Sequence, residues 1–282
     1  MNIKSIKDFT FDIPTSKGLY ALTGENGSGK STLISCISQM FYNETYQLFG
    51  QPDSEAEINF EYKNKTKQIT SFDKQWNRPV GILGIKGFFE GSLVYGFRFK
   101  DTDIKDLKKL SYVPLDLLNN ASNFIRENFC LILHDDKNYY EKLYLLKQSE
   151  AKKYGFRRPP FYCSRNGKLV NQLYMSTGEN LLLTILYSIE LRLNKKKSTI
   201  DNSPDFILFD EIELALHSAA LRRLVFFLNK LADENNFVVF FSTHSIELIR
   251  SINPKNIFYL QRFLDNTLRT INPCYPVMRH VI

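Results

Sequence analysis

The sequence of 282 residues predicts an α/β fold in which a mixed or mainly parallel core sheet is covered by helices. Short, wholly apolar runs support this fold, because strands buried on both faces of a parallel sheet carry apolar residues without alternation. Such runs occupy residues 206–209 and 237–243. Helical patterns follow them, and alternating strands and helices are typical of parallel sheets. A glycine-rich turn at residues 24–29 joins an early strand to the first helix.

The first third of the chain carries clear local signals. Alternating apolar and polar residues predict a strand over residues 3–13, a turn at 14–18 and a second strand over 19–23. Five apolar residues then recur at helical spacing, so the glycine-rich turn is expected to open a helix: Leu33, Ile34, Ile37, Met40 and Phe41. Residues 56–72 contain two alternating runs around a polar turn, which predicts a β-hairpin.

The remaining elements are predicted in the same way. Residues 117–154 have a mainly helical, polar pattern, and residues 177–193 form a very apolar helical pattern. A helix of about fifteen residues is expected from Ala219 onward, after the first apolar run. A third core strand is expected over residues 256–260.

Composition narrows the class of protein. No apolar run approaches the ~18–20 residues that cross a bilayer, and the N-terminus lacks the basic flank and apolar block of a signal peptide. We therefore expect a cytoplasmic protein with no membrane partner. The formal net charge of +7 favours an anionic partner without identifying it. Four widely spaced cysteines make a disulfide framework or a zinc site improbable: Cys36, Cys130, Cys163 and Cys274.

The glycine-rich turn has the chemistry of a phosphate-binding loop. Gly24, Gly29, Lys30 and Ser31 satisfy the pattern G-x-x-x-x-G-K-[ST]. The glycines let the backbone curl so that several amide N–H groups point at one phosphate chain, in front of a helix N-terminus. Lys30 is expected to reach the outer phosphates and the Ser31 hydroxyl to ligate Mg²⁺. A flexible turn is the alternative, but a strand before and a helix after favour the phosphate loop. The expected nucleotide contacts here are Gly24, Glu25, Asn26, Gly27, Ser28, Gly29, Lys30, Ser31 and Thr32.

Two adjacent carboxylates follow the first apolar run, in the segment "FILFDE". Asp210 comes at the carboxyl end of that strand, where ligands of open α/β sheets bind. Asp210 is expected to hold Mg²⁺ through water, and Glu211 to orient the attacking water or accept its proton. The alternative is that these acidic residues merely end a strand. The phosphate loop elsewhere in the chain favours the catalytic interpretation.

The segment "FDEIELALHSAALRRL" at 209–224, followed by "VVFFSTHS" at 238–245, resembles ABC-type ATPases of the RecF, Rad50/SMC and OLD group. It is most similar to the AAA-15/AAA-21 type, whose motif is DE-x-E-x-x-LH-P. Glu213 and His217 match this motif, whereas Ser218 replaces the usual proline. The resemblance implies a P-loop NTPase fold with an ABC-ATPase-like head, and hydrolysis of ATP with Mg²⁺.

The resemblance also implies roles for residues outside that segment. His244 matches the switch histidine, which contacts the γ-phosphate. Ser176 and Gly178, in "YMSTGENLLLTIL", resemble the ABC signature that binds the γ-phosphate held by the other protomer. The pattern S-x-x-E is equally a capping box that needs no ligand, and the two interpretations are compatible. Glycine in a first helical turn costs about 1 kcal/mol relative to alanine, which close approach of a nucleotide would explain.

The resemblance further implies a head-to-tail homodimer that sandwiches ATP. We expect one ATPase domain over residues 1–282. Its nucleotide-binding core comprises residues 1–42 and 174–282, and residues 43–173 form an inserted β and helical lobe. We expect no Toprim nuclease domain. The glutamine of the Q-loop is left open between Gln68 and Gln75, and the adenine-stacking residue between Phe9 and Phe11.

Residues 151–168 combine basic and aromatic side chains, which suits contacts to DNA or RNA backbones and bases. The alternative is a solvated loop whose aromatic side chains pack inward. The basic residues of this stretch are Lys152, Lys153, Arg157, Arg158, Arg165 and Lys168, and the interleaved aromatic residues are Tyr154, Phe156, Phe161 and Tyr162. Basic residues elsewhere in the chain that would extend such a surface are Lys105, Lys108, Lys109 and Lys195–Lys197.

Three functions remain open. The first is an ATP-dependent dimeric clamp or switch in DNA repair or anti-phage defence, acting with a separate effector or nuclease protein, in a dimer or higher assembly. The second is a regulatory ATP switch that cages a toxic effector without touching nucleic acid. The third is a transporter subunit, which the 146 positions from Lys30 to Ser176 disfavour because they exceed the usual spacing.

Overall fold

The computed structural model describes residues 3, 6–43, 45–52, 55–91, 110–156, 158–165, 167–197, 203–213 and 216–275. The chain divides into two compact units. The first unit comprises residues 1–91, 201–214 and 225–282, and the second comprises residues 92–200 and 215–224.

A six-stranded sheet forms the centre of the first unit. In sheet order the strands are β13 (Leu268–Ile271), β12 (Ile257–Arg262), β1 (Gly18–Gly24), β11 (Phe237–Ser242), β10 (Asp205–Phe209) and β5 (Lys86–Glu90). Neighbouring strands are parallel except for β13, which pairs antiparallel with β12. The predicted α/β fold with a mainly parallel core sheet is therefore confirmed. Every residue of β10 and β11 is buried, which explains their unbroken apolar sequences.

The register of this sheet brings the carboxyl ends of its central strands to one edge. Phe209 at the end of β10 lies opposite Phe241 of β11 on one side and Glu90 of β5 on the other. Gly24 at the end of β1 lies opposite Leu260 of β12. Whatever follows each of these strands in the sequence is thus delivered to the same edge.

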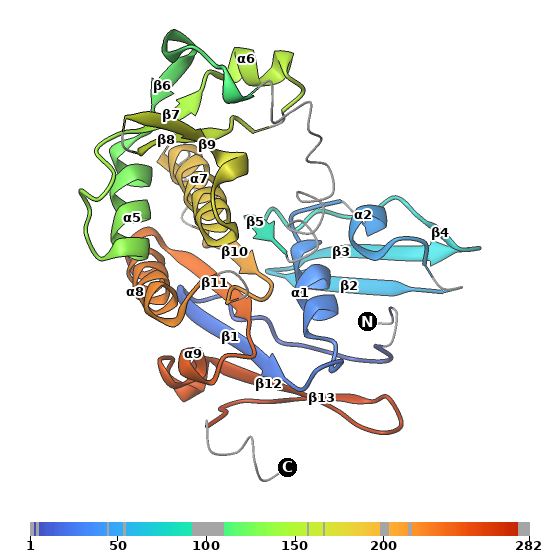
Figure 1. The fold of residues 1–282 in the computed structure, drawn as a ribbon. Helices are drawn as coiled ribbons and strands as arrows, with labels where there is room; N and C mark the ends of the chain where they lie inside the picture. The colour runs from blue at the N-terminus through green and yellow to red at the C-terminus, as the bar shows by residue number, and fades with distance from the viewer. Residues whose placement is uncertain are drawn as a thin grey trace. The chain divides into compact units, whose positions relative to one another are not determined.

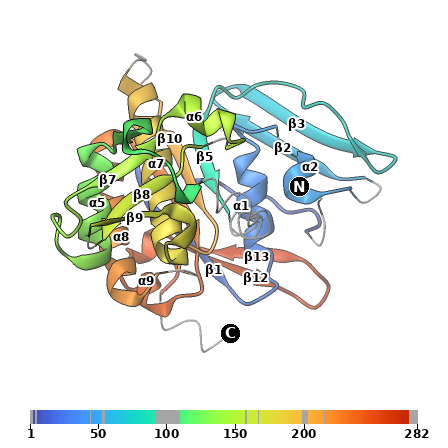
Figure 2. The ribbon, with the colours of Figure 1, turned by 45° about the horizontal axis from the view of Figure 1, so that its top comes forward.

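Helices cover the sheet of the first unit. α1 (Lys30–Ser38) contacts β1, β5, β10 and β11, as Figures 1 and 2 show. Its apolar side chains join a buried cluster with residues of the sheet, including Leu22, Leu208 and Phe240. The shorter helices are α2 (Thr45–Phe49) and α9 (Ile246–Arg250), and α8 (Ser218–Asn235) begins in the second unit and continues in the first.

The predicted hairpin is present as β2 (Glu57–Tyr62) and β3 (Lys65–Phe72), with a short third strand β4 (Gln75–Trp76). Lys67 ties it to the end of α1. The Lys67 ammonium donates hydrogen bonds to Gln39 O at 2.5 Å, Tyr42 O at 2.9 Å and Asn43 Oδ1 at 2.8 Å. The side chain is buried, and burial lowers the pKa of Lys67. Lys67 therefore acts as a cationic cap for the carbonyl groups that leave the helix.

The second unit contains a four-stranded antiparallel sheet in the order β6 (Leu118–Asn120), β7 (Leu143–Leu146), β8 (Phe161–Arg165), β9 (Lys168–Asn171). Its helices are α5 (Asn123–His134), α6 (Gln148–Lys153) and α7 (Thr177–Lys197), and α5 packs on α7. The prediction of a mainly helical segment over 117–154 was wrong in part, because β6 and β7 lie within it. The long helix predicted from residue 177 is confirmed.

The strand predicted over residues 3–13 is wrong. Ile3 and Ile6 form an isolated bridge, and residues 7–13 have no regular secondary structure. The alternating apolar side chains instead pack against the sheet: Phe11 contacts Phe240 and Phe258, with ring centroids 5.9 and 5.3 Å away. Within the described residues, no helix combines the length and apolar character needed to cross a membrane.

Replacement of Lys67 by Met is expected to lower the free energy of unfolding by about 2 kcal/mol, because three acceptors near the end of α1 lose a charged donor. Denaturant unfolding followed by circular dichroism measures the change. Lys65→Met, an exposed lysine on the same strand, is the matched control and is expected to stay within about 0.5 kcal/mol of wild type. Equal losses in the two variants would contradict the capping role.

Candidate functional site

The loop between β1 and α1 leaves backbone N–H groups available to a ligand. Gly27 and Gly29 have φ values of 76° and 100°, in the left-handed region that glycine adopts without strain. α1 begins at Lys30 behind Gly29, and no side chain caps this end of the helix. A helix start whose first-turn N–H groups lack a side-chain acceptor is a favourable place for an anion.

The side chains of the loop also fit a polyphosphate. The Lys30 ammonium is 5% exposed and donates to Gly24 O at 3.2 Å and Glu25 O at 2.8 Å, so it is held inside the loop. The buried Ser28 Oγ has no hydrogen-bond partner among the described residues. A buried cation and an unsatisfied hydroxyl are groups that bound phosphate oxygens would satisfy. Glu25, Asn26 and Gly27 are exposed, as is Ser31, while Thr32 is half-buried.

The carboxylate of Asp210 is fixed by a residue that sequence reasoning missed. The Ser242 hydroxyl, at the end of β11, donates to Asp210 Oδ1 at 2.5 Å and accepts from the Glu211 N–H at 2.9 Å. Ser242 is completely buried and Asp210 is 4% exposed. Ser242 could be found only from the strand register: Phe209 pairs with Phe241, so the next residues, Asp210 and Ser242, lie beside each other.

Glu211 has an unusual backbone and an unusual acidity. Its φ of 54° lies in the left-handed region, which costs a residue other than glycine on the order of 1–3 kcal/mol. Burial raises the pKa of Glu211, Asp210 and Glu213 raise it further, and the Lys30 ammonium opposes them. A carboxylate whose pKa is raised toward neutrality is a better proton acceptor than an exposed one.

His244 follows β11 and is held through its backbone. Its N–H donates to Glu213 Oε1 at 2.5 Å. The second oxygen, Glu213 Oε2, is buried and has no hydrogen-bond partner in the described part of the chain. Glu213 thus joins the segment after β10 to the segment after β11. His217, the other match to the motif, is exposed next to Ser218, where α8 begins.

The sheet edge carries a buried carboxylate besides Asp210 that was not predicted from the sequence. Glu90 ends β5, is 1% exposed, and accepts the Asp210 N–H at 3.1 Å through its carbonyl oxygen. A carboxylate directly after the apolar pair "FF" was the available signal. The two Q-loop candidates lie elsewhere: Gln68 is on β3, where Nε2 donates to Glu57 Oε1 at 2.9 Å, and Gln75 is on β4.

The predicted adenine-stacking residues are engaged in packing. Phe9 is 5% exposed, and its ring stacks on that of Phe11 with centroids 6.4 Å apart. Phe11 belongs to the partly buried side chains around the core cluster of the first unit. Neither ring is presented as a free stacking surface.

Ser176 and Gly178 lie in the second unit, at the start of α7. The capping box is present: Glu179 N–H donates to Ser176 Oγ at 3.3 Å, while Glu179 Oε2 accepts from Ser176 N at 2.8 Å and from its Oγ at 2.9 Å. Ser176 is exposed and Gly178 is buried. Contact of Ser176 and Gly178 with a nucleotide on another protomer stays a prediction.

The basic stretch at 151–168 does not present its aromatic rings to bases. Phe161 and Tyr162 are each 2% exposed within β8, and burial raises the pKa of Tyr162. Tyr154 and Phe156 pack against the buried cluster that contains Tyr162. The inward-packed alternative is therefore confirmed for these side chains. Arg158 donates to Ser188 Oγ at 3.2 Å. Four of the basic candidates lie outside the described residues: Arg157, Lys105, Lys108 and Lys109.

Known proteins resemble this chain in sequence and in fold. A family model described as an AAA domain matches residues 1–243. The methionine import ATP-binding protein MetN of Campylobacter jejuni is 23% identical over 268 residues, which are 89% of this chain and 62% of MetN. The chain thus spans less than two thirds of that relative.

Two solved structures share the fold over almost the whole chain. An SmcHead bound to the C-winged helix domain of ScpA has a TM-score of 0.61 at 18% identity, covering 96% of this chain and 94% of that one. An Smc head domain with an extended coiled coil, bound to the C-terminal domain of ScpA from Pyrococcus furiosus, has a TM-score of 0.59 at 14% identity, with the same coverage of 96% and 94%.

The glycines of the loop differ in a way that mutation can test. A Cβ on Gly24 would clash with the Leu260 carbonyl oxygen and lie 2.9 Å from Ser28 Oγ, whereas a Cβ on Gly27 would meet nothing within 4 Å. Gly24→Ala is expected to lower the free energy of unfolding by about 2–3 kcal/mol. Gly27→Ala, the matched control, is expected to cost about 1 kcal/mol from its φ alone. Chemical denaturation measures both, and a Gly24→Ala protein as stable as the Gly27→Ala protein would contradict the described packing.

Proposed function

Since the chain belongs to the AAA domain family and has the fold of ABC- and SMC-type ATPase heads, we propose that it binds and hydrolyses Mg-ATP at the carboxyl edge of the sheet in its first unit. The observation that carries the proposal is the meeting of three segments at this edge. The loop with Lys30 follows β1, the pair Asp210–Glu211 follows β10, and His244 follows β11. Such a meeting of cationic, acidic and N–H groups is what phosphoryl transfer needs.

Each group has a distinct task in the proposed reaction. The loop N–H groups and Lys30 bind the phosphate chain, and Lys30 exchanges the carbonyl oxygens of Gly24 and Glu25 for phosphate oxygens. Ser31 and Asp210 are the residues that would hold Mg²⁺, and Ser242 orients Asp210 for this. When bound, the metal ion neutralises charge on the phosphate oxygens.

Glu211 orients the attacking water and accepts its proton, which its raised pKa favours. His244 faces the γ-phosphate and responds to its loss. The Glu213 side chain acts on both segments, because it accepts the His244 N–H and its negative charge raises the pKa of Glu211.

We propose that two copies enclose the nucleotide, with Ser176 and Gly178 of the second copy completing the site. The exposed Ser176 before α7 supports this proposal, because the N-terminus of a 21-residue helix presents the positive end of its dipole to a phosphate. In this arrangement residues 1–282 act as one ATPase domain, with the core of residues 1–42 and 174–282 serving nucleotide binding.

The biological role we favour is an ATP-dependent clamp or switch that acts with a separate effector protein in DNA repair or anti-phage defence. The similar SmcHead structures are bound to parts of ScpA, which supports a protein partner. The net charge of +7 is compatible with DNA or RNA, although the inward rings of residues 151–168 remove one candidate surface. A switch that cages a toxic effector is the second candidate. The name of MetN supports a transporter subunit as the third.

Glu211→Gln should trap the proposed dimer, because it removes the proton acceptor and leaves the phosphate-binding groups in place. With Mg-ATP we expect Glu211→Gln to double in mass by size exclusion with light scattering, and to show at least about a hundredfold lower turnover than wild type. Lys30→Ala is the matched control, and it should stay monomeric because it lacks the ammonium group that binds the phosphates. Single chains of Glu211→Gln with bound ATP would contradict the dimer, and normal turnover of Glu211→Gln would contradict the role of Glu211.

A further inference from the structure

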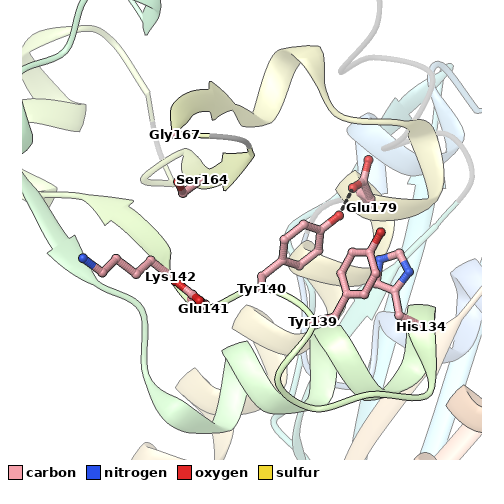
Figure 3. A pocket seen from close by; sticks show the side chains of 8 residues that line it. All are labelled: His134, Tyr139, Tyr140, Glu141, Lys142, Ser164, Gly167 and Glu179. Carbon is pink, nitrogen blue, oxygen red and sulfur yellow. Dashed lines mark hydrogen bonds between the residues drawn. The ribbon is translucent and has the colours of Figure 1, made fainter.

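A cavity distant in sequence from the phosphate loop lies wholly within the second unit. Its volume is about 680 Å³. The lining residues with charged or aromatic side chains come from the end of α5, the loop before β7 and the start of α7: His134, Tyr139, Tyr140, Glu141, Lys142 and Glu179 (Figure 3). A cavity of this size holds a small molecule, or one side chain with its neighbouring backbone.

One wall of the cavity is aromatic. The rings of His134 and Tyr139 stack with centroids 3.6 Å apart and an angle of 13°. Tyr140 meets the Tyr139 ring edge-on at 4.9 Å. Tyr139 is 54% exposed, so part of its ring remains open to a ligand. An open aromatic face attracts an organic cation, and arginine above all because its planar guanidinium also stacks.

The charged groups of the cavity favour the same ligand. Two carboxylates line it, the exposed Glu141 and the buried Glu179, against one ammonium. Figure 3 shows the Lys142 side chain extending away from the aromatic rings. Glu141 forms no ion pair with any described residue. An anionic ligand would face both carboxylates, whereas a guanidinium has carboxylate and ring partners within one cavity.

A hydrogen-bonded chain that is buried at Tyr140 and Glu179 joins the cavity to the exposed Ser176 at the start of α7. The Tyr140 hydroxyl donates to Glu179 Oε1 at 3.0 Å, as Figure 3 shows. The other oxygen, Glu179 Oε2, accepts from both the N–H and the hydroxyl of Ser176. Tyr140 and Glu179 are 5% and 7% exposed. A ligand that moves the Tyr140 ring or draws Glu179 toward itself therefore changes the hydrogen bonds of Ser176.

We propose that this cavity binds a guanidinium group, supplied by free arginine or by an arginine of a peptide. Its occupancy changes the hydrogen bonds of Ser176 through Tyr140 and Glu179. The binding part stands on the cavity alone. The control part rests on the proposed function, because it requires Ser176 to contact the nucleotide of a second copy.

Binding is tested without nucleotide, by calorimetric titration of the full chain. N-acetyl-arginine amide represents the free cation and an acetylated Gly-Arg-Gly peptide amide represents the peptide source, while N-acetyl-citrulline amide is the uncharged isostere. We expect the arginine probes to bind and citrulline to bind at least about fivefold more weakly. The probe with the higher affinity identifies the source. Equal binding of citrulline, or no binding of either arginine probe, would overturn the proposal.

Variants locate the site. Glu141→Gln and Tyr139→Leu are each expected to weaken arginine binding about threefold to fivefold. Glu127→Gln, which changes a glutamate of α5 outside the cavity, is the matched control and should bind as wild type does. Equal affinity in all four proteins would place the bound arginine elsewhere and overturn the proposal.

Control of Ser176 is tested by the arginine dependence of ATP turnover. A saturating concentration of the arginine probe is expected to change the ATP turnover of wild type at least about twofold. The turnover of Tyr140→Phe should be the same with and without the probe, because this variant keeps the ring and loses the hydrogen bond to Glu179. Binding without any change in turnover would retain the site and overturn the control. Absence of turnover in wild type would contradict the proposed function and leave the binding result intact.

Discussion

The parallel pairing of β10 with β11 places Asp210 beside Ser242, and the rest of the candidate site depends on this contact. The hydrogen bond of 2.5 Å between the Ser242 hydroxyl and the Asp210 carboxylate is buried, and the same hydroxyl accepts the Glu211 N–H. A one-residue shift in register would turn these side chains to opposite faces. The backbone of Glu211, held at a φ of 54°, is sustained by the structure around it.

The core strands β1, β10, β11 and β12 and the hairpin of β2 and β3 were predicted from sequence, whereas β5 and the strands of the second unit were not. The unbroken apolar residues of β10 and β11 identify them without knowledge of their neighbours. β5 was missed because "KGFFE" is short and mixes glycine and charge with its two phenylalanines. Residues 7–13 alternate like a strand, yet Phe9 and Phe11 pack on the core without pairing to a neighbour. Local patterns report burial, but strand pairing depends on residues far away in sequence.

The same distinction applies to the site. The phosphate loop and the pair Asp210–Glu211 are short motifs with a fixed chemistry, so they were visible in the sequence. Ser242 and Glu90 acquire a role only through the register of β11 and β5 against β10, which a local motif does not encode. The link of Glu213 to the His244 N–H likewise spans 31 positions. For residues 151–168, composition alone did not decide between a basic surface and inward packing, because both use the same aromatic residues.

A structure of the protein with Mg²⁺ and a non-hydrolysable ATP analogue tests the proposed contacts to the phosphates and the metal ion. We expect the Lys30 ammonium to leave the carbonyl oxygens of Gly24 and Glu25 for the phosphates. Ser31 and Asp210 would hold the metal ion, and Ser242 would keep its hydrogen bond to Asp210. Nucleotide bound away from this loop, or Lys30 still on the two carbonyl groups beside a bound nucleotide, would contradict the proposed contacts.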